Sequence, residues 1–401
     1  MNILIYIPDI TQSWGGIRQY AAGLIRLLSK DAINKYYIYH NSNDPEILDL
    51  LKNNVSLYHV QDADISLSKI TKRIKIDKYI RRVIIHKAWR TIKIKTPSLI
   101  ELLIKSFRID IVHCPYQFIP KTNKAKLIVT LHDVQELHFP DFFSAEERAS
   151  RAVNFLDYLR RADKVVVSYE HVKQDLITYF AVDATAINVI LLDMGKLWFD
   201  RFTLSDVSLL QQLNLPDDFI LFPANTWKHK NHVRLLQAIA LLRDKYDCKV
   251  NLICSGHLTP YFSEIQSVAD ELKLTEQVKF LGVVDEVTLY NLYKRCRGVV
   301  VPTLYEAGSF PLMESILMQV PVVCSNVTSL PETVDNKKFV FDPFSVESIA
   351  LAVRELYSSE SYQQESIANS RIVGQKLLST GALQKCLAMY AEAMSARMSP
   401  Y

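Results

Sequence analysis

The sequence predicts an α/β protein built from two parallel, doubly wound sheets. Short β-branched runs alternate with amphipathic helical stretches along most of the chain, which is the pattern of β-α-β units. The alternation restarts after an irregular polar stretch near 195–210, and 401 residues, 49% of them hydrophobic, suffice for two domains. We therefore expect two Rossmann-like halves whose strand carboxyl ends face each other across a central cleft.

The first half, residues 1–200, begins with the strand-like run NILIYIP and a helix in GGIRQYAAGLIRLLSK. Later strands are expected in DIVHCP, KLIVTLH, KVVVS and NVILL, with helices over 144–161 and 169–180. The second half, residues 201–379, repeats the pattern in FILFPA, KVNLICS, VKFLG, GVVVPTL and PVVCS. A last helix within 380–401 is expected to pack back on the first half.

Composition excludes several classes of protein. No uninterrupted apolar run approaches the roughly 18 residues of a spanning helix, and Pro8 and Asp9 interrupt the apolar N-terminus too early for a signal peptide. The six cysteines form no CxxC pair, so we expect reduced thiols in a cytoplasmic protein. Cysteines and histidines do not cluster at ligand spacing, so no metal site is expected.

Positive charge is concentrated in residues 69–108, which carry 13 Lys and Arg against two acidic residues. The whole chain has a formal charge of only +4. Isoleucines and Trp89 interleave with the cations, so one interpretation is docking on an anionic membrane surface. A helix pair with a solvated basic face and a nucleic-acid patch are the alternatives.

The stretch YEAGSFPLMES combines a helix start with two carboxylates. Residues 308–310 present backbone N–H groups at a predicted helix N-terminus, which favours an anion such as phosphate. Glu306 and Glu314 would repel a phosphate, but they can accept hydrogen bonds from hydroxyls. A ligand with both a phosphate and several hydroxyls is a nucleotide sugar. For Glu314 the alternative is a carboxylate that complements the helix dipole.

The stretch FPANTWKHKNH ends a predicted strand and begins a helix. Lys228, His229 and Lys230 therefore lie at the carboxyl end of a parallel strand, where cations can compensate a diphosphate. A solvated basic turn is the alternative.

Together these motifs resemble the retaining GT-B glycosyltransferases of family 4. The matching stretches are YEAGSFPLMES, PVVCSNVTSLPE, ANTWKHKNH, TLHDVQELHFPDFFS and GGIRQYAAGLIRLL, and they keep the family's order along nearly the whole chain. The resemblance implies the GT-B fold, with the donor nucleotide bound by the second half.

The resemblance also implies roles for individual donor-side residues. Glu306 would bind hydroxyls of the donor sugar, and Glu314 those of the ribose. Lys230 would neutralise the leaving diphosphate. The remaining donor-side candidates would contact the sugar, the phosphates or the base, and they are Asn225, Lys228, Val283, Val284, Gly308, Ser309 and Phe310.

On the first half, the resemblance places His132 over the sugar near its anomeric centre. Gly15 and Gly16 would let the backbone approach the diphosphate and the acceptor. Asp133 either orients the imidazole or is a turn residue at the strand end, so the catalytic candidates are His132, Asp133, Lys230 and Glu306. The family's usual arginine is replaced by Ala224, and Lys228 is the candidate to supply its charge.

The expected activity is transfer of a sugar from a nucleotide sugar, with retention of configuration and without cofactor or metal. The lone D-x-D, Asp62-Ala-Asp64, is interpreted as a surface turn. The residues of these motifs most resemble those of mannosyl or rhamnosyl transferases of bacterial O-antigen or capsule synthesis. This resemblance implies GDP-mannose as the donor and a lipid-linked glycan as the acceptor. The enzyme would then work at the inner face of the plasma membrane. The alternatives are an epimerase or inverting transferase on the same fold, or a sugar- or nucleic-acid-binding protein.

Overall fold

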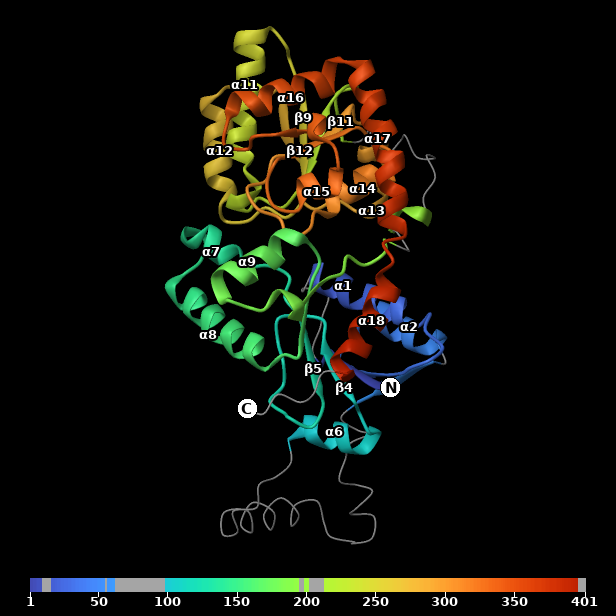
Figure 1. Cartoon of the computed structure of the whole chain (residues 1–401). Coiled ribbons are helices and arrows are strands. Elements are labelled where there is room, and N and C mark those ends of the chain that lie inside the picture. Colours follow the sequence, from blue (N-terminus) through green and yellow to red (C-terminus); the bar gives the residue numbers. More distant parts are fainter. Residues whose placement is uncertain (9–15, 55, 62–97, 195–197, 202–212, 396–401) are drawn as a thin grey trace, which may run out of the picture.

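The computed structural model describes residues 1–8, 16–54, 56–61, 98–194, 198–201 and 213–395. Within them the chain forms two lobes, each with a parallel sheet at its centre (Figure 1). The two parallel sheets expected from the sequence are confirmed. Most of the basic segment 69–108, together with Gly15 and Asp62-Ala-Asp64, lies outside the described residues.

The first sheet has the strand order β3-β2-β1-β4-β5-β6-β7 in the described part of the chain. All its paired strands run parallel, and Leu4 of β1 lies between Tyr37 and Val112 of its neighbours. Its strands are β1 (Asn2–Tyr6), β2 (Lys35–Tyr39), β3 (Leu57–Val60), β4 (Ile111–Cys114), β5 (Lys126–Thr130), β6 (Lys164–Val167) and β7 (Ile187–Val189).

Helices cover both faces of this sheet because each crossover between parallel strands needs one. They are α1 (Gly16–Leu28), α2 (Pro45–Asn53), α6 (Leu99–Phe107), α7 (Gln135–His138), α8 (Ala145–Arg161) and α9 (Glu170–Phe180). The apolar face of α1 packs against the sheet, with Leu24 and Leu28 fully buried.

The second sheet has the order β10-β9-β8-β11-β12-β13 among the described residues. Its strands are β8 (Ile220–Pro223), β9 (Leu252–Ser255), β10 (Val278–Phe280), β11 (Gly298–Val301), β12 (Val322–Ser325) and β13 (Val340–Phe341). The helices around it are α11 (His232–Tyr246), α12 (Phe262–Glu271), α13 (Glu286–Arg295), α14 (Phe310–Leu317), α15 (Leu330–Val334), α16 (Val346–Ser358) and α17 (Glu360–Leu378). Strands β2, β3 and β13 are additional to those expected from the sequence.

The chain returns to the first lobe through α18 (Ala382–Ser395), which packs against α1 (Figure 1). Its Tyr390 is fully buried in the first core, and the hydroxyl of Tyr390 is 2.8 Å from His113 Nδ1. The chain passes from one lobe to the other after β7 and returns between α17 and α18. A hydrogen bond joins these two crossing segments, because the Thr380 hydroxyl donates to Asp193 Oδ1 at 2.7 Å.

The lobes also contact each other directly through Tyr305, which follows β11. Its ring lies among His138, Phe139 and His171 of the first lobe, with centroid distances of 5.4, 6.3 and 6.1 Å. The Val134 amide donates to the Tyr305 hydroxyl at 3.4 Å. Tyr305 is only 3% exposed, so it anchors the two lobes to each other.

None of the described helices combines the length and the apolar character that crossing a membrane requires.

Candidate active site between the two lobes

A cavity of about 820 Å³ lies between the lobes. It is bordered by α1 and α2, by the ends of β5 and β6, by the first interlobe crossing and by the N-terminus of α14. Six residues predicted from the sequence line it, namely Gly16, His132, Asp133, Gly308, Phe310 and Glu314. The other described candidates are not among its lining residues: Asn225, Lys228, Lys230, Val283, Val284, Glu306 and Ser309.

The N-terminus of α14 is formed by local sequence signals. Ser309 is its N-cap, and the Ser309 hydroxyl accepts a hydrogen bond from the Leu312 amide at 3.4 Å. Proline follows in the first turn, where its missing N–H costs nothing. The helix therefore begins at Phe310 and directs its dipole and first-turn amides toward the cleft end that Gly308 and Phe310 line. An anionic group placed there would be stabilised.

Two glycines mark the close approach of the lobes. A Cβ added to Gly308 would lie 3.0 Å from the ring of Tyr169 in the first lobe. A Cβ added to Gly16 would lie 3.5 Å from the ring of Phe310 in the second lobe. A larger residue at 308 would thus force the lobes or the Tyr169 ring to move.

Lys230 and Glu306 form an ion pair next to this helix. Lys230 Nζ is 2.5 Å from Glu306 Oε1, and the two side chains are 18% and 10% exposed. The turn before α11 positions the lysine, because Asn231 has a left-handed backbone (φ 66°) and donates through Nδ2 to two carbonyl oxygens, each at 2.9 Å. The Glu306 amide donates to Thr328 Oγ1 at 3.1 Å. The pair thus holds a cation at Glu306, four residues before α14 begins.

The other two residues of the KHK turn, Lys228 and His229, have different surroundings from Lys230. Lys228 Nζ lies 5.7 Å from the Phe142 ring centroid, a cation–π contact with the first lobe. Burial and the neighbouring Lys230 lower the pKa of His229 to about 3, so its ring is neutral at physiological pH. Only Lys230 of these three is paired with a carboxylate of the proposed site.

Glu314 lines the cavity one turn into α14. Its Oε2 accepts a hydrogen bond from the hydroxyl of Tyr293 at 2.8 Å. Burial and the adjacent Glu314 carboxylate raise the pKa of Tyr293 well above its usual value, so the tyrosine remains a donor. This contact orients the carboxylate for which the family resemblance implies a role at the ribose hydroxyls.

His132 is held by the backbone. Its Nε2 donates to the Pro115 carbonyl at 3.2 Å, and Tyr20 packs edge-on against the ring at a centroid distance of 4.8 Å. Burial lowers the pKa of His132, and Asp133 and the Pro115 carbonyl only partly oppose this, so the ring is neutral. The Asp133 carboxylate instead contacts Arg151, at 3.4 Å. Asp133 therefore acts on His132 through its charge, and the carbonyl fixes the ring.

Asn225, and Val283 and Val284, which were expected near the base, lie on loops of the second lobe. Asn225 Oδ1 accepts a hydrogen bond from the His257 amide at 2.8 Å, so it fixes the loop after β9. Val283 is 75% exposed, whereas Val284 packs against the core of the second lobe.

Several cavity residues carry no sequence signal of their own. Arg18, Glu46, Tyr169 and Asp193 line the cavity, but their partners are distant in the chain. Tyr169 could have been found, because it comes just after β6 and strand carboxyl ends border the cleft.

Comparison with known proteins agrees with this geometry. The family described as Glycosyltransferase Family 4 matches residues 14–191, and the one described as Glycosyl transferases group 1 matches residues 210–373. The two matches together cover both lobes. The chain belongs to these glycosyltransferases.

Relatives and solved structures support the same assignment. The O-antigen chain mannosyltransferase B of Escherichia coli is 24% identical over 378 residues, which cover 94% of this chain and 95% of that protein. A glycosyltransferase of Rickettsia africae superposes with a TM-score of 0.67 at 19% identity, covering 99% of both chains. Anabaena HepE, solved with UDP and glucose, gives 0.66 at 17% identity, covering 98% of this chain and all of that one. The GT-B fold of this glycosyltransferase is thereby confirmed.

Proposed function

We propose that this glycosyltransferase transfers mannose from GDP-mannose to a lipid-linked glycan, with retention of configuration. The observation that carries the proposal is the Lys230–Glu306 ion pair, whose glutamate directly follows the interlobe contact residue Tyr305 and comes four residues before α14 begins. A cation and a helix N-terminus together suit a leaving diphosphate. The mannosyl donor and glycan acceptor rest on the similarity to the Escherichia coli O-antigen enzyme.

In this scheme the diphosphate binds the amides at 308–310 and draws Lys230 from Glu306. Glu306 then accepts hydrogen bonds from the sugar, and Glu314 those of the ribose. The departing phosphate oxygen takes the proton of the acceptor hydroxyl, the glycosidic bond to the diphosphate breaks, and the new bond forms on the same face. Positioning the two reactants can lower the barrier by ~7–11 kcal/mol.

The donor is tested first by thermal unfolding with UDP, GDP, dTDP and CMP, each alone and as a sugar conjugate. A ligand at about 100 times its Kd should add ~2.7 kcal/mol to the free energy of unfolding. Selective stabilisation by GDP-mannose supports the proposal. Selective stabilisation by a nucleotide with another base would mean that the donor is a different nucleotide sugar. Measuring donor consumption with and without acceptor separates transfer from epimerisation.

Metal independence is part of the proposal, because Lys230 and α14 supply the positive charge. Transfer should continue in excess chelator. A requirement for added manganese would contradict this assignment of the charge.

We also propose that the basic segment 69–108 docks the enzyme on anionic membranes. The support is its charge and its interleaved apolar residues. Neutralising Arg81, Arg82 and Lys87 to glutamine should release the protein from phosphatidylglycerol vesicles but not alter its weak binding to neutral ones. Unchanged binding to the anionic vesicles would refute the docking.

A further inference from the structure

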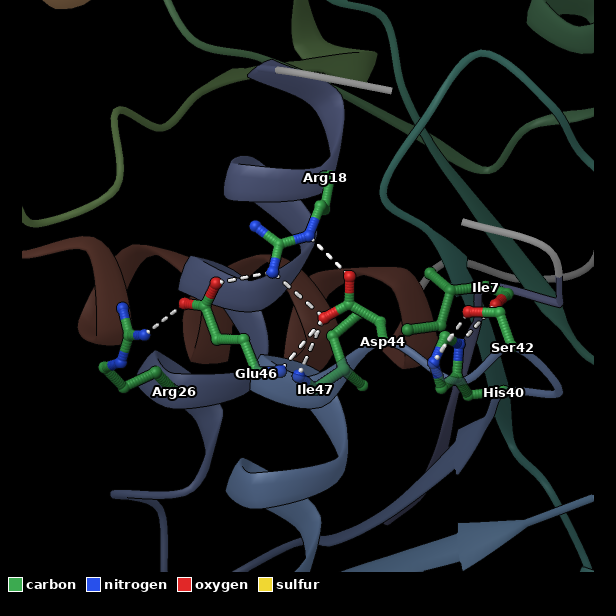
Figure 2. A network of polar contacts seen from close by, with 8 residues as sticks. All are labelled: Ile7, Arg18, Arg26, His40, Ser42, Asp44, Glu46 and Ile47. Carbon is green, nitrogen blue, oxygen red and sulfur yellow. Dashed lines mark hydrogen bonds and ion pairs between the residues drawn. The ribbon is translucent and has the colours of Figure 1, made fainter. Parts of the chain in front are cut away.

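The first-lobe wall of the cavity is built around an ion-pair network between α1 and α2. Figure 2 shows Arg18 and Arg26 of α1 directed at Asp44 and Glu46, at the start of α2. Arg18, Arg26 and Glu46 line the cavity. The network begins only half a turn after Gly16, the residue that meets Phe310 of the opposite lobe.

The guanidinium of Arg18 is engaged by two carboxylates. Its Nε and Nη2 contact the two oxygens of Asp44 at 2.5 and 3.0 Å, and Nη2 is 2.9 Å from Glu46 Oε2. Arg26 Nη2 contacts the other oxygen of Glu46 at 2.8 Å. Both cations are thus already paired within the protein.

Asp44 fixes this arrangement. It is the N-cap of α2, and its Oδ1 accepts from the amides of Glu46 and Ile47 at 3.2 and 3.1 Å. Its side chain is fully buried. Burial by itself would raise the pKa of Asp44, but the hydrogen bonds from Arg18 and the Ile47 amide outweigh it and lower the pKa. The carboxylate is therefore ionised and holds Arg18 in place.

The first-lobe side of the cavity carries an excess of negative charge. Two arginines line it, Arg18 and Arg26, against four carboxylates: Glu46, Asp49, Asp133 and Asp193. The part of the chain that the structure describes has no group of three or more side chains placed to hold a metal ion. A phosphate or carboxylate on this side would meet paired cations and repulsive anions. Hydroxyls, by contrast, can donate to the carboxylates and accept from guanidinium N–H groups.

We infer that this wall receives the acceptor as an uncharged sugar, and that the Arg18–Asp44–Glu46 network excludes acceptors carrying an anionic group on that sugar. The inference rests on the proposed function, because it assigns the opposite wall, with the N-terminus of α14, to the donor. Arg18 and Arg26 of the first-lobe wall are already paired with carboxylates, so they are not available to compensate a second diphosphate, that of the acceptor. A lipid-linked acceptor must therefore keep its own diphosphate outside the cavity.

The probes are methyl α-mannoside, its 6-phosphate and its 6-amino-6-deoxy derivative, titrated by NMR into the full chain saturated with GDP. The neutral glycoside should bind at least about tenfold more tightly than the phosphate, because like charges oppose binding. Equal or tighter binding of the phosphate would overturn the inference, as would weaker binding of the amine than of the phosphate, because surplus carboxylates favour a cation over an anion. Failure of all three to bind would overturn it as well.

Glu46→Gln separates a charge effect from a structural one. Glu46 is 39% exposed, and its amide form can still accept from one arginine while leaving a positive charge uncompensated. The phosphate should gain roughly tenfold relative to the neutral glycoside, as expected for one new charge-assisted contact. An unchanged ratio would contradict the role of the network. If Glu46→Gln does not fold, Asp49→Asn removes another lining carboxylate and should shift the ratio in the same direction.

The matched control is Glu347→Gln, which alters an exposed glutamate paired with Lys245 on the second lobe. It should leave the ratio of the two affinities unchanged. Stabilisation by GDP is recorded for every variant. If no nucleotide stabilises the protein, the proposed donor fails, and the glycosides alone still decide the inference.

Discussion

The two lobes hold their cations in different ways. On the second lobe, Lys230 forms one short contact with Glu306, which comes four residues before α14 begins. On the first lobe, Arg18 makes three contacts with two carboxylates, one of them fully buried and capping a helix. A cation with one carboxylate partner can exchange it for a diphosphate. A cation held by several carboxylates is a fixed part of the wall.

The largest effect that this comparison predicts is on stability. Arg18→Met leaves the buried Asp44 carboxylate without its cation, and such a loss typically costs about 3–5 kcal/mol in the free energy of unfolding. Urea unfolding measures it. Combining Arg18→Met with Asp44→Asn should recover most of the loss, because asparagine still caps α2. Loss below roughly 1 kcal/mol in the single variant would mean that Arg18 is not structural.

Lys230→Met should act on catalysis. Removing the positive charge beside the leaving group should lower kcat about 100-fold, the usual cost of losing one electrostatic contact to a transition state. Steady-state kinetics with GDP-mannose measure the effect, with Lys245→Met on the outer surface as the control. If kcat stays within about threefold of wild type, the diphosphate is stabilised elsewhere.

The two glutamates of YEAGSFPLMES should differ in kind. Glu314→Ala should raise the donor KM about tenfold, since a ribose contact is equally strong in ground and transition states. Glu306→Ala should mainly lower kcat, because it also removes the partner that positions Lys230. Equal and mild effects of both substitutions on KM and kcat would remove them from the site.

The smallest effect concerns the contact between the walls, where His171 packs against Tyr305. Burial lowers the pKa of His171 to about 4, and neither ring nitrogen has a hydrogen-bond partner in the described structure. The unfolded chain therefore takes up the proton first as the pH falls, so His171 stabilises above its ordinary pKa and loses this on acidification. His171→Phe should reduce the loss of stability between about pH 7.5 and about pH 6 by ~1 kcal/mol.

The wild-type curve is the reference, because other buried histidines lower stability on acidification in the same way. His138 has the opposite sign, since its hydrogen bond to Asp175 raises its pKa and it stabilises at lower pH. Identical pH dependence in wild type and His171→Phe would contradict the burial of a neutral ring at this contact.

Much of the fold and part of the site follow from local sequence. The runs FILFPA and GVVVP were expected to be strands and form β8 and β11, and serine followed by Phe-Pro starts α14 at the expected position. These features depend on neighbours in the chain, which the sequence displays directly. Local sequence also predicted Glu314, one turn into α14, and the basic turn before α11.

Pairings between distant residues were decided only by the tertiary structure. Lys230 meets Glu306 across 76 positions, and Arg18 meets Asp44 across 26. These contacts depend on the strand order of each sheet and on the facing of the two lobes, neither of which periodicity encodes. The sequence by itself determined which elements form and which chemical groups end them. Only packing decided which carboxylate each cation meets, because that depends on distances between side chains that are far apart in the sequence.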